Sequence, residues 1–407
     1  MRILLAAQWY EPIIGGEEIH VRTLAKALAA RGHQVTVAAL AHQERPERYV
    51  EDGVEVRRLR GSLQGVPRLY TDAARQSVPP FPDPGLARAL RRLIDEVRPD
   101  VIHAHNWIVY SLLPIKPSTT PLVLTLHDYS LTCATKVRLY RGRACDGPAP
   151  AKCMRCTAAH YGLPKGMATL AGLWAMQPAI HRRVDSIVCV SDSVARDSDV
   201  ARFGGRHTVI PNFLDDDYGM LEPSDEPEGL PDGPFIMYAG SLSRIKGLDP
   251  LVRAYRTLNA GTRPPLVVVG YRGHERLPVL DRLPADVHLV TDLPRRSVAA
   301  AWRRSLFAVV PSICLEACGL VALEAMTFGR PVVASDIGGL PELISHEQSG
   351  LLVEPGSVSE LRAAMQRLID DAKLRAALGS EAEIVARQYR AGTVVPAIES
   401  LYESLLG

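Results

Sequence analysis

Short apolar runs alternate with amphipathic segments along the chain. Residues 3–7 form an apolar run, apolar positions then recur at helical spacing up to Gly32, and residues 35–40 form a second run. This pattern predicts a strand–helix–strand unit with a right-handed crossover. Further strand-like runs occur at residues 101–104, 122–126, 186–190 and 208–210. Such short, bounded runs are typical of strands buried on both faces of a parallel sheet, so the pattern predicts an α/β fold.

A segment rich in Pro, Gly, Asp and Glu, LEPSDEPEGLPDGP at residues 221–234, has the composition of a linker. A second α/β series follows, with a helix at 248–259 and strands at 235–240, 266–270, 287–290, 307–311 and 331–335. We predict two doubly wound domains, residues 1–215 and 216–389, with a hinge near 211–234. The last helix, within residues 390–407, is a candidate to return to the first domain. Ligands bind beyond the carboxyl ends of strands in such sheets, so we expect the site in a cleft between the domains.

Composition narrows the class of protein. The chain has 407 residues, 47% of them apolar and 23% charged, which excludes a disordered chain and a fibrous repeat. A formal net charge of +2 gives no global field that would attract nucleic acid. The N-terminal segment reads as a first strand rather than a signal peptide, and no apolar window is long enough to span a membrane. We therefore expect a cytoplasmic protein.

The densest candidate chemistry lies at residues 307–340. A predicted strand ends at Pro311, a loop carries Glu316, and a helix begins near Gly319 with Glu324 in its second turn. Free amides at a helix start favour an anion, and a carboxylate such as Glu324 accepts two hydroxyls, as on a ribose diol. Alternatively, both glutamates only stabilise the helix start through its dipole. The common G-x-G-x-x-G and P-loop fingerprints are absent.

The same stretch reads PS-x3-E-x2-GL-x3-EAM-x2-G-x-PVVAS, and it resembles the signature of the retaining GT-B glycosyltransferases called family 4. The resemblance covers nearly the whole chain. It extends to the opening GG-x-E and L-A-x-x-L-x-x-x-G-H-x-V patterns, PDVIHAH (99–105), SDSVARD (191–197), VIPN (209–212) and SGLLVEPGS (349–357). It implies a GT-B fold, in which two Rossmann-like domains face each other across a cleft, and a nucleotide diphosphate sugar as donor.

The resemblance also implies roles for residues of the second domain. Glu324 matches the residue that holds the ribose hydroxyls, and Glu316 matches one that holds the donor sugar. The amides of Gly319 and Leu320 match those near the sugar and phosphates.

The loop GSLSRIKG, residues 240–247, links a strand to a helix and carries Arg244 and Lys246. Two cations in this place can neutralise a leaving diphosphate without a metal ion. Lys246 matches the family's lysine, whereas Ser241 stands where the family usually has arginine. We expect Arg244 to substitute for that arginine; the alternative is a solvated basic loop.

The first domain carries a second set of candidates. Gly15 and Gly16 follow the first strand, where glycine lets the backbone approach a diphosphate, unless this is an ordinary tight turn. His127 follows the predicted strand 122–126 and matches a family histidine that lies near the anomeric centre. It would stabilise charge on the sugar ring or bond a sugar hydroxyl, and Asp128 is a candidate to orient its ring.

His103 and His105 flank Ala104, so on a strand they share one face. Packing or contact with an acceptor explains them better than cation binding does.

No carboxylate nucleophile is evident from the resemblance, although two-step retention would need one at the anomeric carbon. We therefore expect a metal-independent displacement on one face of the sugar, in which the leaving phosphate helps to deprotonate the acceptor. No cofactor is required for this reaction.

Four of the seven cysteines, Cys133, Cys145, Cys153 and Cys156, fall within 24 residues. Four thiolates at such spacing predict a structural Zn²⁺ site that orders an acceptor-side loop. Two disulfides, or free or redox-active thiols, are the alternatives.

Residues 57–98 contain nine arginines and four acidic residues. Arg88, Arg91 and Arg92 lie off the apolar stripe of the predicted helix, as on an ordinary surface helix. Alternatively, these arginines dock the protein peripherally on anionic lipid at the inner face of a membrane, near a lipid-linked acceptor. The apolar run at residues 166–180 is too short to span a membrane and is a candidate acceptor groove or membrane contact.

The leading interpretation is a retaining glycosyltransferase that moves a sugar from a nucleotide diphosphate sugar to a hydroxyl acceptor. The acceptor would be a glycan, a lipid-linked glycan or a small metabolite. A GT-B nucleotide-sugar epimerase and a non-catalytic nucleotide-sugar-binding scaffold are the rivals.

Overall fold

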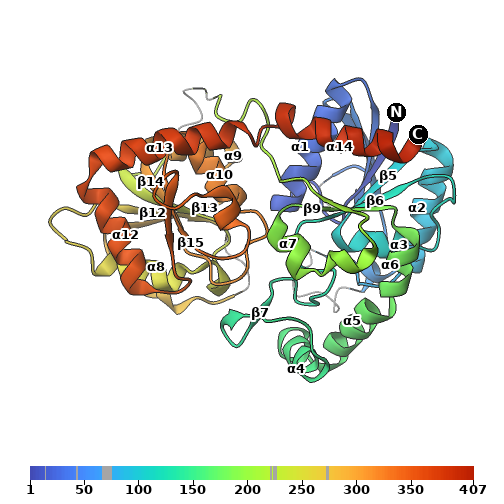
Figure 1. The fold of residues 1–407 in the computed structure, drawn as a ribbon, viewed down its shortest axis with the longest axis horizontal. Coiled ribbons are helices and arrows are strands. Elements are labelled where there is room, and N and C mark those ends of the chain that lie inside the picture. The colour runs from blue at the N-terminus through green and yellow to red at the C-terminus, as the bar shows by residue number, and fades with distance from the viewer. Residues whose placement is uncertain (14, 43–44, 67–75, 221, 223–226, 272–274) are drawn as a thin grey trace. The chain divides into compact units, whose positions relative to one another are not determined.

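The computed structural model describes all residues except 14, 43–44, 67–75, 221, 223–226 and 272–274. The chain folds into two units. The first comprises residues 1–140, 145–213 and 391–407, and the second comprises residues 214–390 together with 141–144. Each unit is built on its own sheet (Figure 1).

The sheet of the first unit has the strand order β10-β9-β6-β5-β1-β2-β4-β3. Its pairs are parallel except β3 with β4. The strands are β1 (Arg2–Ala6), β2 (Gln34–Leu40), β3 (Arg48–Glu51), β4 (Val54–Leu59), β5 (Val101–His105), β6 (Leu122–Leu126), β9 (Ser186–Cys189) and β10 (His207–Val209). The strands β7 (Leu139–Tyr140) and β8 (Arg143–Ala144) pair separately.

Two helices of the first unit begin at a residue whose side chain caps them. Asp83 caps α2 by accepting from the amides of Gly85 and Leu86, and Pro84 occupies its first turn. Ser191 caps α7 in the same way. The α-helices are α1 (Gly16–Ala30), α2 (Pro84–Val97), α3 (Val109–Leu112), α4 (Pro150–Tyr161), α5 (Leu163–Ala175), α6 (Gln177–Arg183), α7 (Asp192–Asp197) and α14 (Ala391–Leu406).

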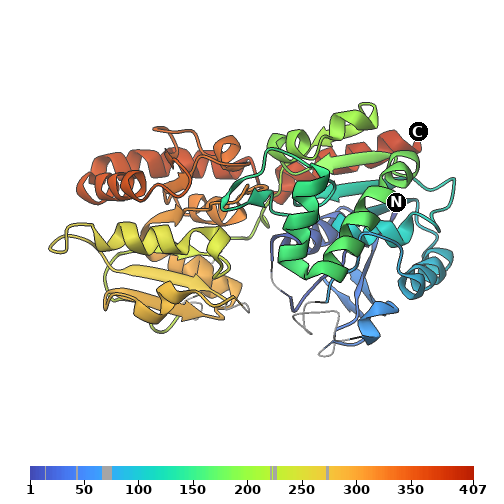
Figure 2. The same cartoon turned by 90° about the horizontal axis from the view of Figure 1, so that it is seen from below.

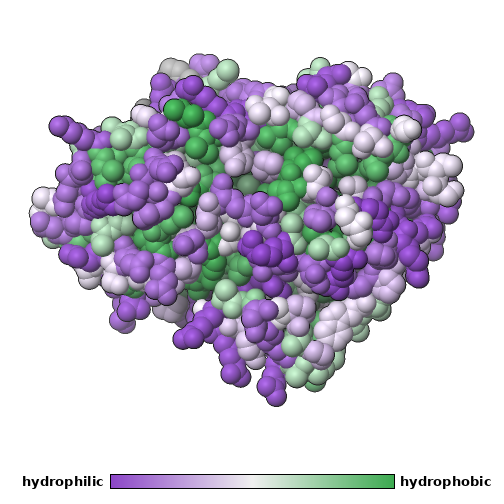
Figure 3. Space-filling model, in the orientation of Figure 1, coloured by the Kyte–Doolittle hydropathy of each residue, from purple (hydrophilic) through white to green (hydrophobic). Residues whose placement is uncertain are grey.

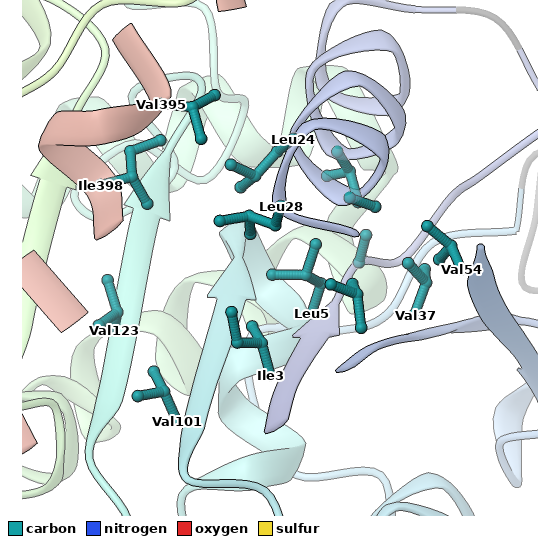
Figure 4. Packing of buried hydrophobic residues seen from close by; sticks show 14 of the residues in the cluster. Ile3, Leu5, Leu24, Leu28, Val37, Val54, Val101, Val123, Val395 and Ile398 are labelled. Atoms are coloured by element: carbon teal, nitrogen blue, oxygen red, sulfur yellow. The ribbon is translucent and has the colours of Figure 1, made fainter. Parts of the chain in front are cut away.

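One face of this sheet is covered by helices from opposite ends of the chain. Side chains of α1 and α14 pack on alternate residues of the strands, because those residues point to the same face (Figure 4). Leu24 and Leu28 come from α1, and Val395 and Ile398 come from α14. Both chain ends lie on this unit in Figure 1 and Figure 2. The last helix therefore belongs to the first unit.

The second unit has a parallel sheet of order β13-β12-β11-β14-β15-β16. Its strands are β11 (Phe235–Ala239), β12 (Leu266–Gly270), β13 (Val287–Thr291), β14 (Ser305–Val310), β15 (Val332–Ser335) and β16 (Gly350–Val353). Its α-helices are α8 (Leu248–Arg256), α9 (Arg295–Arg304), α10 (Leu320–Met326), α11 (Leu340–Leu343), α12 (Val358–Asp370) and α13 (Ala372–Arg387). Apolar clusters fill both faces of the sheet, as expected for a doubly wound fold.

The structure confirms the α/β class and adds strands that the sequence pattern missed. β3 and β4 form an antiparallel edge in which buried and partly exposed positions alternate along β4. Glu55 and Arg57 at partly exposed positions, and Arg58 at a buried one, interrupt the apolar run and hid this strand from a search for continuous apolar residues. Residues 221 and 223–226 of the predicted linker lie outside the described residues. Among the described helices, none is long and apolar enough to cross a membrane.

Candidate active-site residues in each unit

Three loops of the second unit converge because their strands are neighbours. β11, β14 and β15 lie side by side and run parallel, so their carboxyl ends lie at one edge of the sheet. The amide of Ile313 donates to the carbonyl of Ile245 at 2.9 Å, which joins the loop after β11 to the loop after β14. The amide of Gly339, after β15, donates to the carbonyl of Glu316 at 2.8 Å. These bonds bring sequence-distant motifs together.

Two glycines allow this close approach. Gly247 has φ +74, and a Cβ at this position would lie 1.7 Å from the carbonyl oxygen of Pro311. Gly338 has φ +64, and its Cβ would lie 2.2 Å from the carbonyl oxygen of Glu316. Any other residue would force the loops apart, because such distances are far inside van der Waals contact.

Lys246 and Glu316 form an ion pair at this edge. Lys246 Nζ lies 2.6 Å from Glu316 Oε1, and the hydroxyl of Ser312 donates to the same carboxylate. Burial by itself would raise the pKa of Glu316, but the Lys246 charge and these hydrogen bonds outweigh it and lower the pKa. Burial likewise opposes the charge on Lys246, and attraction to Glu316 raises its pKa nevertheless. The pair is therefore charged, and 30% of the Lys246 side chain stays open to a ligand.

Glu324, on α10, has a cationic partner on α9. Arg295 Nε lies 3.6 Å from Glu324 Oε1, and Arg295 Nη1 donates to Asp215 at 2.9 Å. The Arg295 guanidinium also lies over the ring of Tyr218, 4.6 Å from its centroid. Burial raises the pKa of Glu324 despite the neighbouring Arg295. Nε and Nη2 of Arg295 are buried and make no hydrogen bond to the described part of the chain.

The other donor residues predicted for the second domain lie on this unit, whereas Gly16 lies on the first. Gly319 is the N-cap of α10 with φ +76, so the amides of Leu320 and Val321 belong to the first turn of that helix. Arg244 is largely exposed, with 72% of its side chain accessible, and lies 3.7 Å from Glu275. Ser241 bonds to Ser243 through their hydroxyls at 3.1 Å.

In the first unit three histidines meet where β5 and β6 end. His105 closes β5, His127 follows β6, and His20 lies on α1. His105 Nδ1 and His127 Nε2 are 2.9 Å apart, so one nitrogen donates and the other accepts. A ligand nitrogen from each of the three rings lies within 4.8 Å of the others. His127 Nδ1 is buried and has no hydrogen-bond partner in the described structure.

Burial keeps these rings neutral. It lowers the pKa of His127 and of His105 well below the usual value, and the neighbouring imidazoles lower both further. Burial also lowers the pKa of His20 and of His103 to about 3. The neutral ring of His127 suits a hydrogen bond to a hydroxyl better than the stabilisation of a full positive charge.

The prediction that Asp128 orients the His127 ring is wrong. Asp128 accepts from the amide of Ser130 at 2.8 Å and from the side chain of Asn106 at 3.4 Å. His105 is the hydrogen-bond partner of the ring instead. The strand order explains the difference, because β5 and β6 are adjacent and His105 pairs with Thr125. Side chains alternate along a strand, so His105 lies on the same side of the sheet as Thr125 and His127.

Gly15 and Gly16 form the start of α1, with Gly15 as its N-cap. A Cβ at Gly15 would lie 2.4 Å from Oε2 of Glu18. Glu17 accepts from the side chain of Asn106 at 2.8 Å, and burial, together with the charge of Glu18, raises its pKa well above the usual value.

The four cysteines between residues 133 and 156 line one pocket of the first unit, which encloses about 30 Å³. Arg138 and Lys152 line the same pocket. None of these four cysteines forms a disulfide in the structure.

Family comparison decides the class of protein. The family described as Glycosyltransferase Family 4 matches residues 14–218, and the family described as Glycosyl transferases group 1 matches residues 222–385. The chain belongs to the family 4 glycosyltransferases, of group 1. The predicted family is thereby confirmed.

Similar proteins cover almost the whole of this glycosyltransferase. A D-inositol 3-phosphate glycosyltransferase from Catenulispora acidiphila is 29% identical over 96% of this chain and 91% of its own. A glycogen synthase from Mycobacterium tuberculosis is 28% identical over 91% of this chain and 86% of its own.

Solved structures share the fold at lower identity. Sucrose-phosphate synthase from Thermosynechococcus elongatus has a TM-score of 0.74 and 20% identity, covering 100% of this chain and 99% of its own. Anabaena HepE, in complex with UDP and glucose, has a TM-score of 0.71 and 20% identity, covering 99% of this chain and 100% of its own. The predicted GT-B class is confirmed.

Two residues of the glycosyltransferase escaped the sequence reasoning. Arg295 contacts Glu324 from another helix, and the sequence around Arg295 carries no motif that indicates a binding role. Asn106 has φ +52, accepts from the amide of His127 at 3.0 Å and donates to Glu17. Its position directly after PDVIHAH, at a strand end, was the available signal.

Proposed function

We propose that this protein transfers a sugar from a nucleotide diphosphate sugar to a hydroxyl acceptor with retention of configuration. The observation that carries the proposal is the Lys246–Glu316 ion pair at the carboxyl ends of β11 and β14. Parallel α/β sheets bind ligands at this edge, and the Lys246 side chain is 30% exposed there. Membership of the glycosyltransferase family and the UDP held by HepE support the donor class.

The second unit is proposed to bind the donor. Lys246 and Arg244 would neutralise the diphosphate, and the amides of Gly319 and Leu320 would hold its oxygens. Glu324 would accept the two ribose hydroxyls, with Arg295 keeping the carboxylate in position. Glu316 would bond hydroxyls of the transferred sugar.

The first unit is proposed to supply the acceptor surface, the catalytic His127 and the backbone of Gly16. His127 would bond a sugar hydroxyl through its buried, unpaired Nδ1 while His105 holds Nε2. The absence of charge on the ring at neutral pH favours this role.

The proposed step is a displacement on one face of the sugar. The bond from the anomeric carbon to the diphosphate oxygen breaks, and a bond to the acceptor oxygen forms on the same face. The acceptor proton passes to the departing phosphate oxygen, so the products are a glycoside and a nucleoside diphosphate. Cationic side chains, rather than a bound metal, would carry the charge of the leaving group.

A thermal-shift screen of nucleotide diphosphate sugars tests the donor site. The wild type, Glu324→Ala and Lys246→Ala are compared, with Lys373→Ala on the exposed surface of α13 as the matched control. A ligand at about 100 times its Kd stabilises the native state by about 2.7 kcal/mol. We expect one nucleotide to shift the wild type and Lys373→Ala but neither site variant. A shift retained in both site variants would overturn the assignment.

Product analysis tests the reaction. Nuclear magnetic resonance of the first product is expected to show the anomeric configuration of the donor, in reactions containing a chelator. An inverted product would contradict retention, and dependence on added Mg²⁺ would contradict metal independence. Conversion of the sugar without any acceptor would indicate an epimerase, and binding without turnover would indicate a scaffold.

We further propose peripheral contact with an anionic membrane through Arg88, Arg91 and Arg92, which are exposed on α2, and through apolar residues of α4 and α5. Met154, Leu163 and Trp174 of α4 and α5 are 39%, 65% and 40% exposed. Figure 3 shows hydrophobic and hydrophilic residues side by side over the region of these two helices. Cosedimentation with anionic vesicles at low salt is expected for the wild type and should weaken in Leu163→Glu. No sedimentation at low salt would overturn this proposal.

A further inference from the structure

Three successive pieces of the chain bring four thiols to one place. Cys133 lies in the loop after β6, Cys145 follows β8, and Cys153 and Cys156 lie on α4 (Figure 1). Cys153 and Cys156 are three residues apart on a helix, so they share a face. The amide of Cys145 donates to the carbonyl of Arg138 at 2.8 Å, which closes the turn between the first two cysteines. The fold thus makes a single pocket lined by all four thiols.

We propose that Cys133, Cys145, Cys153 and Cys156 bind one structural Zn²⁺ through their thiolates. Four cysteine sulfurs are a complete ligand set for a closed tetrahedral zinc site. Each thiol would lose its proton to solvent as the Zn–S bond forms, so no oxidant or reductant is needed. The inference depends on this pocket alone and not on the proposed transfer reaction.

The pocket has the volume and charge that such a site needs. About 30 Å³ is open within it, which is enough for a water molecule and therefore for the smaller Zn²⁺ ion. Four thiolates around Zn²⁺ leave a net charge of −2, and two cations line the pocket to offset it, Arg138 and Lys152.

Arg138 provides an independent observation. Arg138 is only 6% exposed, and its Nη2 lies 3.2 Å from Oδ1 of Asp197. Its Nε is buried and has no hydrogen-bond partner among the described residues. An unpaired, buried N–H of a cation is costly, and a nearby thiolate sulfur would satisfy it. The zinc site therefore explains a group that the metal-free contacts leave unsatisfied.

The thiols are wider apart than a bound ion would hold them. Among the described residues, no three of these sulfur atoms lie within 4.8 Å of one another, whereas tetrahedral Zn–S bonds of about 2.3 Å imply sulfur spacings of about 3.8 Å. Two of the sulfurs make weak contacts with other residues of the pocket lining, Cys133 Sγ with Thr135 at 3.4 Å and Cys145 Sγ with the carbonyl of Gly147 at 3.4 Å. Thiol hydrogen bonds are weak, so zinc binding can replace them.

Zinc would anchor the loop that follows His127. The amide of Cys133 donates to the carbonyl of Tyr129 at 2.9 Å, so Cys133 closes the first turn after that histidine and Asp128. Binding of Cys133 together with Cys153 and Cys156 would tie this turn to α4. Loss of the metal is therefore expected to loosen the loop of the first unit and to leave the fold of the second unit intact.

Metal analysis of the full chain is the direct test. The protein is purified under reducing conditions without chelator, and zinc and free thiols are measured on the same sample. We expect one zinc per chain. Titration with a mercurial thiol reagent should release that zinc as the four thiols react, and cobalt in its place should give tetrahedral thiolate absorption. Protein that neither contains zinc nor takes up zinc or cobalt would overturn the proposal, as would two disulfides among these cysteines.

Variants locate the metal. Cys153→Ser is expected to lose zinc, while Cys189→Ala, which removes a thiol of β9 outside the pocket, is expected to keep it. Zinc retained by Cys153→Ser would overturn the proposal and direct attention to His20, His105 and His127. If Cys153→Ser does not fold, mercurial titration of the wild type still distinguishes the two sites. Modification of the thiols releases zinc that is held by cysteines but not zinc that is held by histidines.

Discussion

The buried charges of the candidate donor site depend chiefly on one opposite charge each. Lys246 and Glu316 keep their charge chiefly because each opposes the effect of burial on the other, and Ser312 adds a hydrogen bond to Glu316. Glu324 shows the opposite balance, because Arg295, at 3.6 Å, does not fully offset burial. Removal of one partner therefore leaves a buried charge uncompensated, and this cost is measurable.

Lys246→Met is expected to lower the free energy of unfolding by about 1–3 kcal/mol, because the carboxylate of Glu316 loses a charged hydrogen bond. Urea denaturation at neutral pH measures this change, with Lys373→Met as the exposed control. The double variant Lys246→Met/Glu316→Gln should recover part of the loss. Equal stability of Lys246→Met and the wild type would contradict the ion pair.

The buried histidines predict acid sensitivity. Burial lowers the pKa of His20 and of His103 to about 3, so the folded state stays unprotonated where the unfolded state, with a pKa near 6.5, binds a proton. Stability is therefore expected to fall as the pH drops from about 6.5 towards 3, by up to about 1.4 kcal/mol per pH unit for each ring.

Comparison of the wild type with His103→Asn isolates one ring, because all other titrations are shared. Unfolding free energies between pH 7 and pH 5 should fall less steeply in the variant. Parallel slopes would contradict the assignment of a neutral buried ring at this position.

At the scale of elements, the second unit depends on loops that touch at the ends of adjacent strands. Glycine at residue 247 permits the loop after β11 to lie against the end of β14. The same strand order brings the carboxylate of Glu316 to Lys246, 70 residues away in the chain. The geometry of the candidate donor site is thus a property of strand adjacency rather than of one motif.

Gly247→Ala is expected to destabilise the protein by at least about 1–3 kcal/mol, because its positive φ is strained for alanine and the methyl group meets the carbonyl of Pro311. Thermal unfolding of Gly247→Ala and Gly233→Ala provides the measurement. At Gly233 nothing lies within 4 Å of the added Cβ, so that control should be nearly neutral. A similar effect of both substitutions would refute the loop contact.

At the scale of the molecule, the chain returns to its first unit after completing the second. α14 buries Ile398 and Tyr402 in the core around β1, β2 and β5, next to α1. The hydroxyl of Tyr402 lies 2.6 Å from Nδ1 of His103, across 299 residues of sequence. The first unit therefore includes both ends of the chain and requires the last helix for its core.

Ile398→Ala is expected to cost about 2–5 kcal/mol, the usual range for truncation of a buried aliphatic side chain. The matched control is Ile384→Ala on α13, where the isoleucine is 50% exposed. Urea denaturation followed by probes in each unit measures both. The loss should appear in the transition of the first unit, and an equal loss for the exposed control would contradict the packing of α14.

Local pattern in the sequence determined the class of fold and the family. Apolar runs such as residues 122–126 and 266–270 coincide with β6 and β12, because burial on both faces requires continuous apolar residues. The spacing of Glu316 and Glu324 can likewise be read directly from the sequence. It indicated a glycosyltransferase, and the family match confirms that class.

Only the tertiary structure decided which side chains meet. Strand order put His105, rather than Asp128, against the ring of His127, and helix packing put Arg295 beside Glu324. Periodicity reports which face of an element is buried, but it carries no information about which distant element covers that face. The contacts that set charge and protonation are long-range, so they follow from the fold and not from any one segment.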